Sequence, residues 1–244
     1  MSYLAYGLDF GTTHSAISVL DGEGRATVLP VSGDNGLIIK SVLLFAQNSP
    51  RPYVGQEAIR QYLAAGMRGR LIQSIKSALV DENFIGTTIN GTRYQIEDLI
   101  ALIISFLKVK ADKIIGQNLD RVVLGRPAIF SDNPKKESLA RDRLIMAAQK
   151  AGFKEIHFQL EPIAAALHYE TSLKRPEKAL IADLGGGTSD FTLMNLSPDR
   201  VNLTDRDADV LQTSGVYVGG DNLDARIMWG KVVKHFGAEA SYRS

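Results

Sequence analysis

Two short Gly/Thr-rich segments of this 244-residue chain share one pattern. LDFGTTHSAIS at residues 8–18 aligns without gaps with ADLGGGTSDFT at residues 182–192, and Asp9/Asp183 and Gly11/Gly185 are identical pairs. The two members of each pair are 174 positions apart (183 − 9). Both copies lie between apolar segments. The repeat therefore predicts two half-domains of like topology that face a cleft.

These residue types suit the binding of a polyphosphate. Glycine lets the main chain approach a ligand closely, consecutive backbone N–H groups form an anion-binding concavity, and Thr hydroxyl groups add donors. A carboxylate would repel phosphate directly, but Asp9 and Asp183 could each face a hydrated Mg²⁺ that lies between the carboxylate and the phosphate. The alternative is a pair of tight hairpins whose Asp residues cap the turns. The presence of two copies favours the phosphate interpretation.

The apolar pattern around these segments predicts a layered α/β fold. Strands are expected at residues 4–9, 15–20, 26–30, 121–125, 156–160, 179–182 and 191–196. Helices are expected at residues 56–65, 95–115, 134–151, 161–171 and 222–236. Each repeated segment falls at the turn between two strands. The strands would thus position both turns.

The composition excludes several classes of function. The chain is 45% hydrophobic and 23% charged, and its formal net charge of +1 lacks the basic excess that binding to duplex DNA needs. It has no cysteine, so disulfides, thiolate zinc sites and cysteine nucleophiles are excluded. No apolar run approaches the ~20 residues of a membrane-spanning helix, and the N-terminus does not resemble a signal peptide. We expect a cytoplasmic protein without nucleic-acid or membrane partners.

Five segments, in the expected order, resemble the motifs of a known superfamily. GLDFGTT at residues 7–13 and DLGGGTSD at residues 183–190 resemble the two phosphate motifs of the actin-like ATPases, and the second is similar to that of the seventy-kilodalton heat-shock (DnaK) chaperones. Three more segments resemble parts of that family. Its lysine segment is matched by SIKS at residues 74–77, its connecting motif by QLEPIAAA at 159–166, and its second-lobe opening by VGGDNLD at 218–224. LGRP at residues 124–127 and AGF at 151–153 are similar to the YegD-like branch. The resemblance implies an actin-like ATPase fold, which is ribonuclease H-like.

The resemblance also implies a role for each matching residue. Asp9 and Asp183 would hold the hydrated Mg²⁺, Lys76 would contact the γ-phosphate or the attacking water, and Glu161 would position that water or a Mg²⁺ ligand. Asp190 would support the second loop. ATP would be bound by Gly11, Thr12, Thr13, Gly185, Gly186, Gly187, Thr188, Gly219 and Gly220. Two alternatives stay open: Glu161 could merely stabilise the start of a helix, and Lys76 could be a surface lysine.

The resemblance implies a complete first lobe and a partial second lobe. The first lobe would span residues 1–172, with an inserted subdomain at about 37–115, and residues 173–244 would begin the second lobe. In the family the second lobe continues to a Gly-rich adenosine motif, and nothing after Asp224 resembles it. We therefore expect a fragment with weak or no turnover alone, although a natural short protein is an alternative. Unfolded client proteins or co-chaperones would bind through the missing C-terminal regions.

Three functions are compatible with this superfamily. The first is the ATP-binding, ATP-hydrolysing domain of a heat-shock-70-like chaperone. The second is a sugar- or acetate-type kinase, and the third is a non-enzymatic actin-like nucleotide sensor or scaffold. The GGGTSD segment and the EPIAA segment favour the chaperone, whereas no separate acceptor motif supports the kinase. The fold alone cannot choose among these functions.

Overall fold

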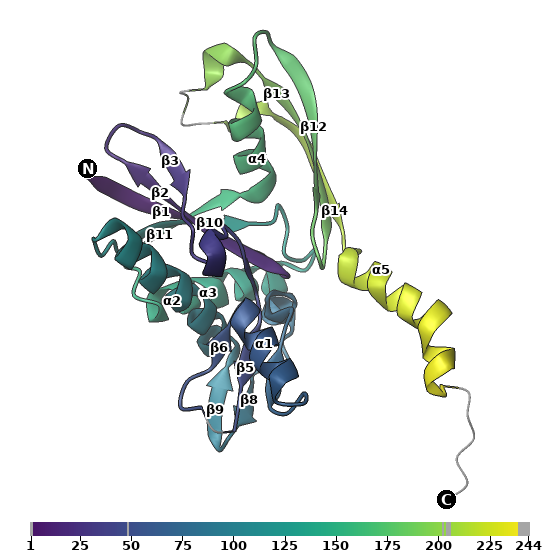
Figure 1. Cartoon of the computed structure of the whole chain (residues 1–244). Helices are drawn as coiled ribbons and strands as arrows, with labels where there is room; N and C mark the ends of the chain where they lie inside the picture. Colours follow the sequence, from purple (N-terminus) through teal and green to yellow (C-terminus); the bar gives the residue numbers. More distant parts are fainter. Residues whose placement is uncertain (1, 48, 202, 204–205, 239–244) are drawn as a thin grey trace, which may run out of the picture.

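The computed structural model describes residues 2–47, 49–201, 203 and 206–238 (Figure 1). Its first half is built on a mixed sheet, in which β1 (Tyr3–Phe10) runs parallel to β10 (Arg121–Arg126), and β10 runs parallel to β11 (Glu155–Leu160). On its other side β1 pairs antiparallel with β2 (His14–Asp21), which also pairs with β3 (Ala26–Val28) and β4 (Ile39–Lys40). The five strands that the sequence predicts in this half are all present.

Two long helices, α2 (Ile96–Ile115) and α3 (Pro134–Lys150), pack against this sheet. Leu99, Ile103 and Leu107 recur along one face of α2 at helical spacing and are fully buried. Asn133 begins α3, because its side-chain oxygen accepts a hydrogen bond from Lys135 N at 2.9 Å. Both helices match their predicted extents to within one residue. Together with the sheet they enclose the main hydrophobic core.

Between β4 and α2 the chain forms smaller elements. Strands β6 (Tyr53–Val54), β5 (Leu43–Phe45) and β7 (Arg70–Ile72) make a three-stranded sheet, against which α1 (Gln56–Ala64) packs. A 3₁₀ helix, η2 (Ile75–Val80), follows, and then the hairpin of β8 (Gly86–Ile89) and β9 (Thr92–Gln95). The hairpin turns at Asn90 and Gly91, whose φ angles of 49° and 80° suit a two-residue turn. None of the short strands between β3 and β10 is among the predicted strands.

The second half is a separate antiparallel sheet with the order β12 (Glu177–Leu184), β13 (Ser189–Leu196), β14 (Val210–Val216). Helix α4 (Glu161–Glu170) leads from β11 to this sheet and packs Ile163 and Ala166 against Met194 and Leu196. The sequence predicts β12 and β13 but not β14, whose VLQTSGV run is polar in its middle. The strand forms because β13 offers a free edge to pair with.

A buried ion cluster fastens α4 to the segment before β14. Arg206 donates to both carboxylate oxygens of Glu170, at 2.7 and 2.8 Å, and to Asp209 at 2.5 Å. The backbone N–H of Ser197 donates to the same Glu170 carboxylate at 2.7 Å. The pairing lowers the pKa of Glu170, which stays ionised. The ion cluster therefore adds a buried polar contact to the apolar packing of α4 on the sheet.

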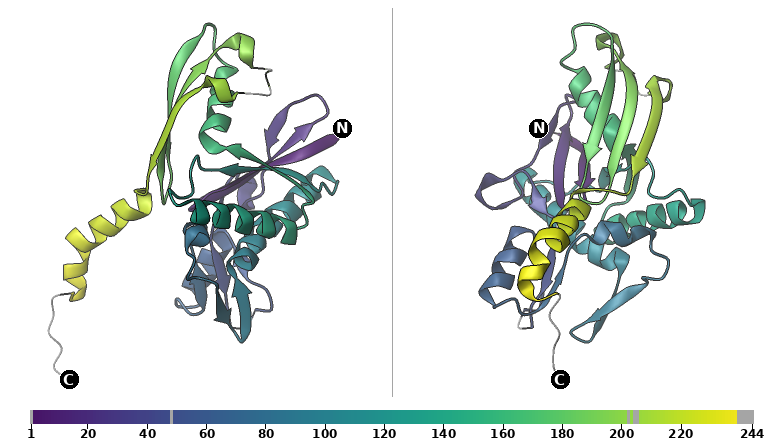
Figure 2. Two further views of the ribbon diagram at one scale, coloured as in Figure 1. Left: turned by 180° about the vertical axis from the view of Figure 1, so that it is seen from behind. Right: turned by 90° about the vertical axis from the view of Figure 1, so that its right-hand side faces the viewer.

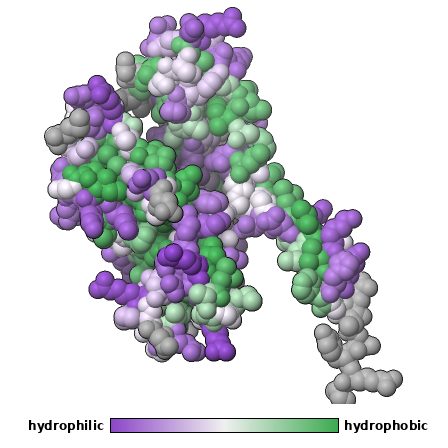
Figure 3. Space-filling model, in the orientation of Figure 1, coloured by the Kyte–Doolittle hydropathy of each residue, from purple (hydrophilic) through white to green (hydrophobic). Residues whose placement is uncertain are grey.

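The chain continues from the second sheet as helix α5 (Gly220–Ile227), a π-helical turn (Met228–Val232) and a 3₁₀ helix (Val233–Phe236). Figure 2 shows this helical segment extending away from the rest of the molecule. Its apolar residues Leu223, Ile227 and Trp229 are exposed, the last at 73%, and Figure 3 shows an apolar stripe along it. The helix predicted at residues 222–236 is present, whereas residues 239–244 lie outside the described part. Among the described helices, none is both long and apolar enough to cross a membrane.

Candidate active site

The internal repeat of the sequence is also a repeat of backbone geometry. At the tip of the β1–β2 hairpin the Gly11 N–H donates to the His14 carbonyl at 3.0 Å, and at the tip of the β12–β13 hairpin the Gly185 N–H donates to the Thr188 carbonyl at 2.9 Å. Asp9 is the residue before the last of β1, and Asp183 occupies the same position in β12. The two hairpin turns are therefore equivalent in local geometry, as the repeat predicts.

The two hairpin tips meet at one cleft of about 900 Å³. Residues of both sheets, of η2 and of α4 line it. Of the predicted site residues, those that line the cleft are Asp9, Gly11, Thr12, Thr13, Lys76, Glu161, Asp183, Gly185, Gly186, Thr188 and Gly220. The other three, Gly187, Asp190 and Gly219, lie directly behind this lining. The fold thus brings together all fourteen residues, which are spread from position 9 to position 220.

The glycines allow backbone segments to pack more closely than side chains would permit. A Cβ atom on Gly186 would lie 2.1 Å from Thr13 Oγ1, and one on Gly187 would lie 3.3 Å from Ser77 Oγ. A Cβ atom on Gly219 would lie 2.4 Å from the Gly186 carbonyl oxygen. The second loop is therefore held between the first loop, η2 and the start of α5.

Backbone hydrogen bonds attach the start of α5 to the second loop. The Gly220 N–H donates to the Gly185 carbonyl at 3.0 Å, and the Asp221 N–H donates to the Gly186 carbonyl at 2.9 Å. Asn222 Oδ1 accepts from the Gly219 N–H at 2.9 Å, which caps the helix. These contacts explain why the glycine pair of the VGGDNLD segment belongs to the site although it follows a different strand.

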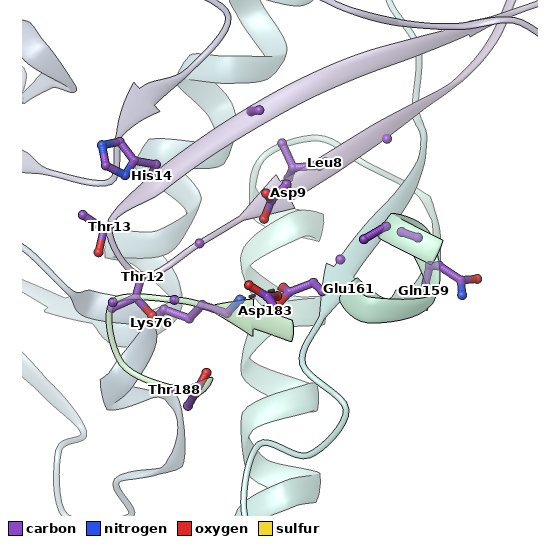
Figure 4. Close-up of a pocket in the computed structure, with 18 of the residues that line it drawn as sticks. Leu8, Asp9, Thr12, Thr13, His14, Lys76, Gln159, Glu161, Asp183 and Thr188 are labelled. Carbon is purple, nitrogen blue, oxygen red and sulfur yellow. Dashed lines mark hydrogen bonds and ion pairs between the residues drawn. The ribbon is translucent and has the colours of Figure 1, made fainter. Parts of the chain in front are cut away.

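A lysine and a glutamate form an ion pair inside the cleft. Lys76 Nζ lies 2.8 Å from Glu161 Oε1, and their side chains are only 10% and 19% exposed. Figure 4 shows the two side chains extending toward each other beside Asp183. Glu161 is the first residue of α4, where the helix dipole favours a negative charge. Lys76 is therefore not a surface lysine, and Glu161 does more than begin a helix.

The carboxylates of Asp9, Glu161 and Asp183 all lie near the Lys76 ammonium group. Desolvation in the cleft raises the pKa of Asp9 to about 6; the charges of Glu161 and Asp183 add to the rise and Lys76 opposes it. Burial, followed by the charge of Glu161, also raises the pKa of Asp183. The site therefore carries an excess of negative charge that a cation would relieve.

Asp190 supports the second loop from behind. Its side chain is buried and accepts a hydrogen bond from Thr188 Oγ1 at 3.0 Å. Burial raises the pKa of Asp190, while the Thr188 hydrogen bond lowers it. The contact holds the Thr188 side chain at the edge of the cleft.

One contact between the two halves was not singled out from the sequence. Ser74 Oγ donates to Asp221 Oδ2 at 2.9 Å, which joins the residues before Lys76 to the start of α5. Ser74 has a left-handed backbone with φ of 54°, uncommon for a residue other than glycine. Both residues lie within segments that the resemblance includes, but neither type nor spacing signals that they meet.

Two lobes with equivalent hairpin loops around a shared cleft define the actin-like ATPase fold, a class of nucleotide-binding proteins. The family model for the Hsp70 protein matches residues 66–242, which is more than half of the chain. The chain therefore belongs to the Hsp70 family and is an Hsp70-like, ATP-binding domain of that chaperone family. The match includes Lys76, Glu161 and the second loop. It begins after the first loop, whose equivalence rests on the geometry above.

Proposed function

We propose that this cleft binds the triphosphate of ATP together with Mg²⁺ and supports its hydrolysis. The observation that carries the proposal is the Lys76–Glu161 ion pair, which lies between two equivalent Gly/Thr hairpin tips. Hydrolysis of a phosphoanhydride depends mainly on positioning and on stabilisation of charge. A fixed ammonium group, a carboxylate and two concavities of backbone N–H groups supply these effects.

The residues of the cleft fit a metal-bound polyphosphate. Thr13 Oγ1 is buried and has no hydrogen-bond partner among the described residues, so a donor is available beside Gly186. The described residues include no cluster of three His, Asp or Glu side chains that could bind a metal directly. Asp9 and Asp183 would therefore hold Mg²⁺ through water, an arrangement that this ion commonly adopts. When bound, Mg²⁺ would neutralise phosphate charge.

The loop residues, Lys76 and Glu161 would have different roles in phosphate binding and hydrolysis. The loop N–H groups that do not donate within the turns, together with the Thr12 and Thr13 hydroxyl groups, would bind the phosphates. Asp190 would keep Thr188 in place. Lys76 would stabilise negative charge on the terminal phosphate. Glu161, held by Lys76, would orient the attacking water and accept a hydrogen bond from it. The loop residues are Gly11, Thr12, Thr13, Gly185, Gly186, Gly187 and Thr188; Gly220 lines the cleft as well, and Gly219 lies against Gly186.

The division into lobes also stays a proposal. We place the first lobe at residues 1–172, with an insertion at about 37–115, and the second at 173–244. Helix α2 ends the insertion by returning to the main core, and α4 connects the lobes because it starts at the first sheet and packs on the second. A role with unfolded client proteins or co-chaperones is proposed on family membership alone. A cytoplasmic location is proposed from the absence of cysteine.

Phosphate release from Mg·ATP tests the proposal. We expect the 244-residue chain to hydrolyse ATP only weakly when alone, and Asp183→Asn to reduce that weak rate about 100-fold. Asp142→Asn is the matched control, because Asp142 is a 57% exposed carboxylate on α3. Release of ADP only when a sugar or acetate is added would favour a kinase instead. No ATP-dependent phosphate release, or equal loss in both variants, would contradict the proposal.

A further inference from the structure

Arg143 of α3 donates hydrogen bonds to carbonyl groups at and just after the end of the 3₁₀ helix η2. Arg143 Nη1 donates to the carbonyl oxygens of Ala78, Leu79 and Asp81 at 3.2, 2.9 and 2.9 Å. Its Nη2 donates to the carbonyl oxygen of Phe84 at 3.2 Å. Arg143 is 7% exposed, so these bonds are shielded from water. A single guanidinium therefore binds four carbonyl groups in and after the last turn of η2, of which that of Ala78 also accepts the Asp81 N–H.

The helix that Arg143 holds carries the catalytic-site lysine. Lys76 is its second residue, and the buried side chains of Ile75 and Leu79 attach it to the main core. At its start η2 also contacts the second loop, because Ser77 Oγ lies near Gly187. The helix is only six residues long, so a shift at its far end moves Lys76 as well.

We propose that Arg143 is a positioning residue, which fixes η2 so that Lys76 reaches Glu161. This inference rests on the proposed function where it concerns turnover, but not where it concerns the placement of Lys76. The residues that accept its hydrogen bonds are not among those that line the cleft. It acts through the backbone of η2 and takes no part in the chemistry.

The type of residue matters for this role. The four accepting carbonyl oxygens belong to Ala78, Leu79, Asp81 and Phe84, and a planar guanidinium presents several N–H donors in a fixed fork. A lysine would keep the charge, but its compact ammonium group cannot span these acceptors. Loss of Arg143 would leave several carbonyl groups poorly satisfied in the interior.

Chemical reactivity of Lys76 tests the placement without any need for ATP. The 244-residue chain would be treated briefly with acetic anhydride, and acetylation of Lys76 would be measured by mass spectrometry relative to the exposed Lys135 of α3. In Arg143→Met we expect Lys76 to react about fivefold faster, because local opening exposes it. Arg141→Met is the matched control, since Arg141 is a 56% exposed arginine on the same helix, and it should leave the ratio unchanged.

Measurement of ATP turnover then distinguishes a role of Arg143 in positioning Lys76 from a role in the stability of the whole domain. We expect Arg143→Met to lower kcat about tenfold at nearly constant KM, because misplacement of a catalytic group affects the chemical step. On a Lys76→Ala background the same change should lower kcat no further. If the unaltered chain shows no hydrolysis, the proposed function fails, and Lys76 labelling alone decides this inference.

Two results would overturn the inference. The first is an unchanged Lys76 labelling ratio in folded Arg143→Met, or in Arg143→Lys if the methionine variant does not fold. The second is an equal, additive loss of kcat in the presence and absence of Lys76, which would mean that Arg143 acts on the whole domain.

Discussion

Lys76 Nζ and Glu161 Oε1 lie 2.8 Å apart although the residues are separated by 85 positions. Lys76 comes from a 3₁₀ helix of the first half, and Glu161 begins the helix that leads to the second half. The pair is shielded from solvent and lies next to Asp9 and Asp183. An ion pair in this place orients both groups, so neither needs to be reorganised when a phosphate enters.

Replacing Lys76 by Ala should abolish most turnover but spare folding. The change removes the ammonium group that would stabilise the terminal phosphate, so we expect kcat for ATP hydrolysis to fall about 100-fold or more. The measurement is phosphate release at saturating Mg·ATP, with circular dichroism to verify folding. Lys135→Ala, an exposed lysine on α3, serves as the control. Similar rates in the two variants would mean that Lys76 has no role in hydrolysis.

Replacing Asp9 by Asn should stabilise the Mg²⁺-free protein at neutral pH and have little effect in acid. Desolvation, together with Glu161 and Asp183, raises the pKa of Asp9 in the folded state from 3.8 to about 6. The folded state therefore holds the proton more tightly than the unfolded state, and the wild-type protein loses this stabilisation as pH rises through that window. Asparagine resembles the protonated acid and avoids the loss.

Urea unfolding at about pH 4 and about pH 7.5 measures the Asp9 effect. The gain in midpoint for Asp9→Asn should be larger at the higher pH, and addition of Mg²⁺ with ATP should favour the wild-type protein instead. The exposed Asp142→Asn substitution on α3 should give no pH-dependent difference. A gain that is larger at low pH would contradict this prediction.

Replacing Gly219 by Ala should separate α5 from the second loop. The new Cβ atom would lie 2.4 and 2.5 Å from backbone atoms of Gly186, which cannot move aside as a flexible side chain can. We expect a loss of about 1–3 kcal/mol in the free energy of unfolding and weaker ATP binding, measured by urea titration and calorimetry. Gly230→Ala, where no atom lies within 4 Å, should be neutral or slightly stabilising. A neutral Gly219→Ala would exclude tight packing at this point.

Replacing Arg206 by Ala should destabilise the second sheet strongly. The side chains of Glu170 and Asp209 are 0% and 1% exposed, so the substitution would leave Glu170 buried without its paired cation and Asp209 with Arg200 alone. The expected cost is about 3–5 kcal/mol in the free energy of unfolding. Arg121→Ala, which removes a half-exposed pair with Glu155, should cost much less, because water screens an exposed ion pair. Chemical denaturation compares the two variants, and equal costs would show that the cluster is not shielded from water.

The local pattern of the sequence was enough to predict most elements that carry the site. The repeat around Asp9 and Asp183 predicts two equivalent hairpins, because glycine and strand propensities act over a few residues. The strand β14 was not predicted, because its middle residues are polar. It exists through pairing with β13, a contact between distant segments.

Arg143 illustrates a signal that was available but easy to overlook. The surrounding segment is rich in Lys, Glu and Arg, so Arg143 resembles another exposed charged residue. It nevertheless lies three residues after Ala140 and one before Leu144, on the buried face of α3. That spacing could have identified a buried arginine. Its acceptors, the carbonyl groups at the end of η2, could not be predicted from spacing.

The sequence by itself determined the chemistry that is available: two acidic Gly/Thr loops, an EPIAA helix start and a lysine segment, with the family that they resemble. Only the tertiary structure decided that Lys76 pairs with Glu161, that Thr13 packs against Gly186, and that Asp221 meets Ser74. Local propensities act between neighbours along the chain. These contacts join different sheets and helices, so they depend on how the two lobes pack around the cleft.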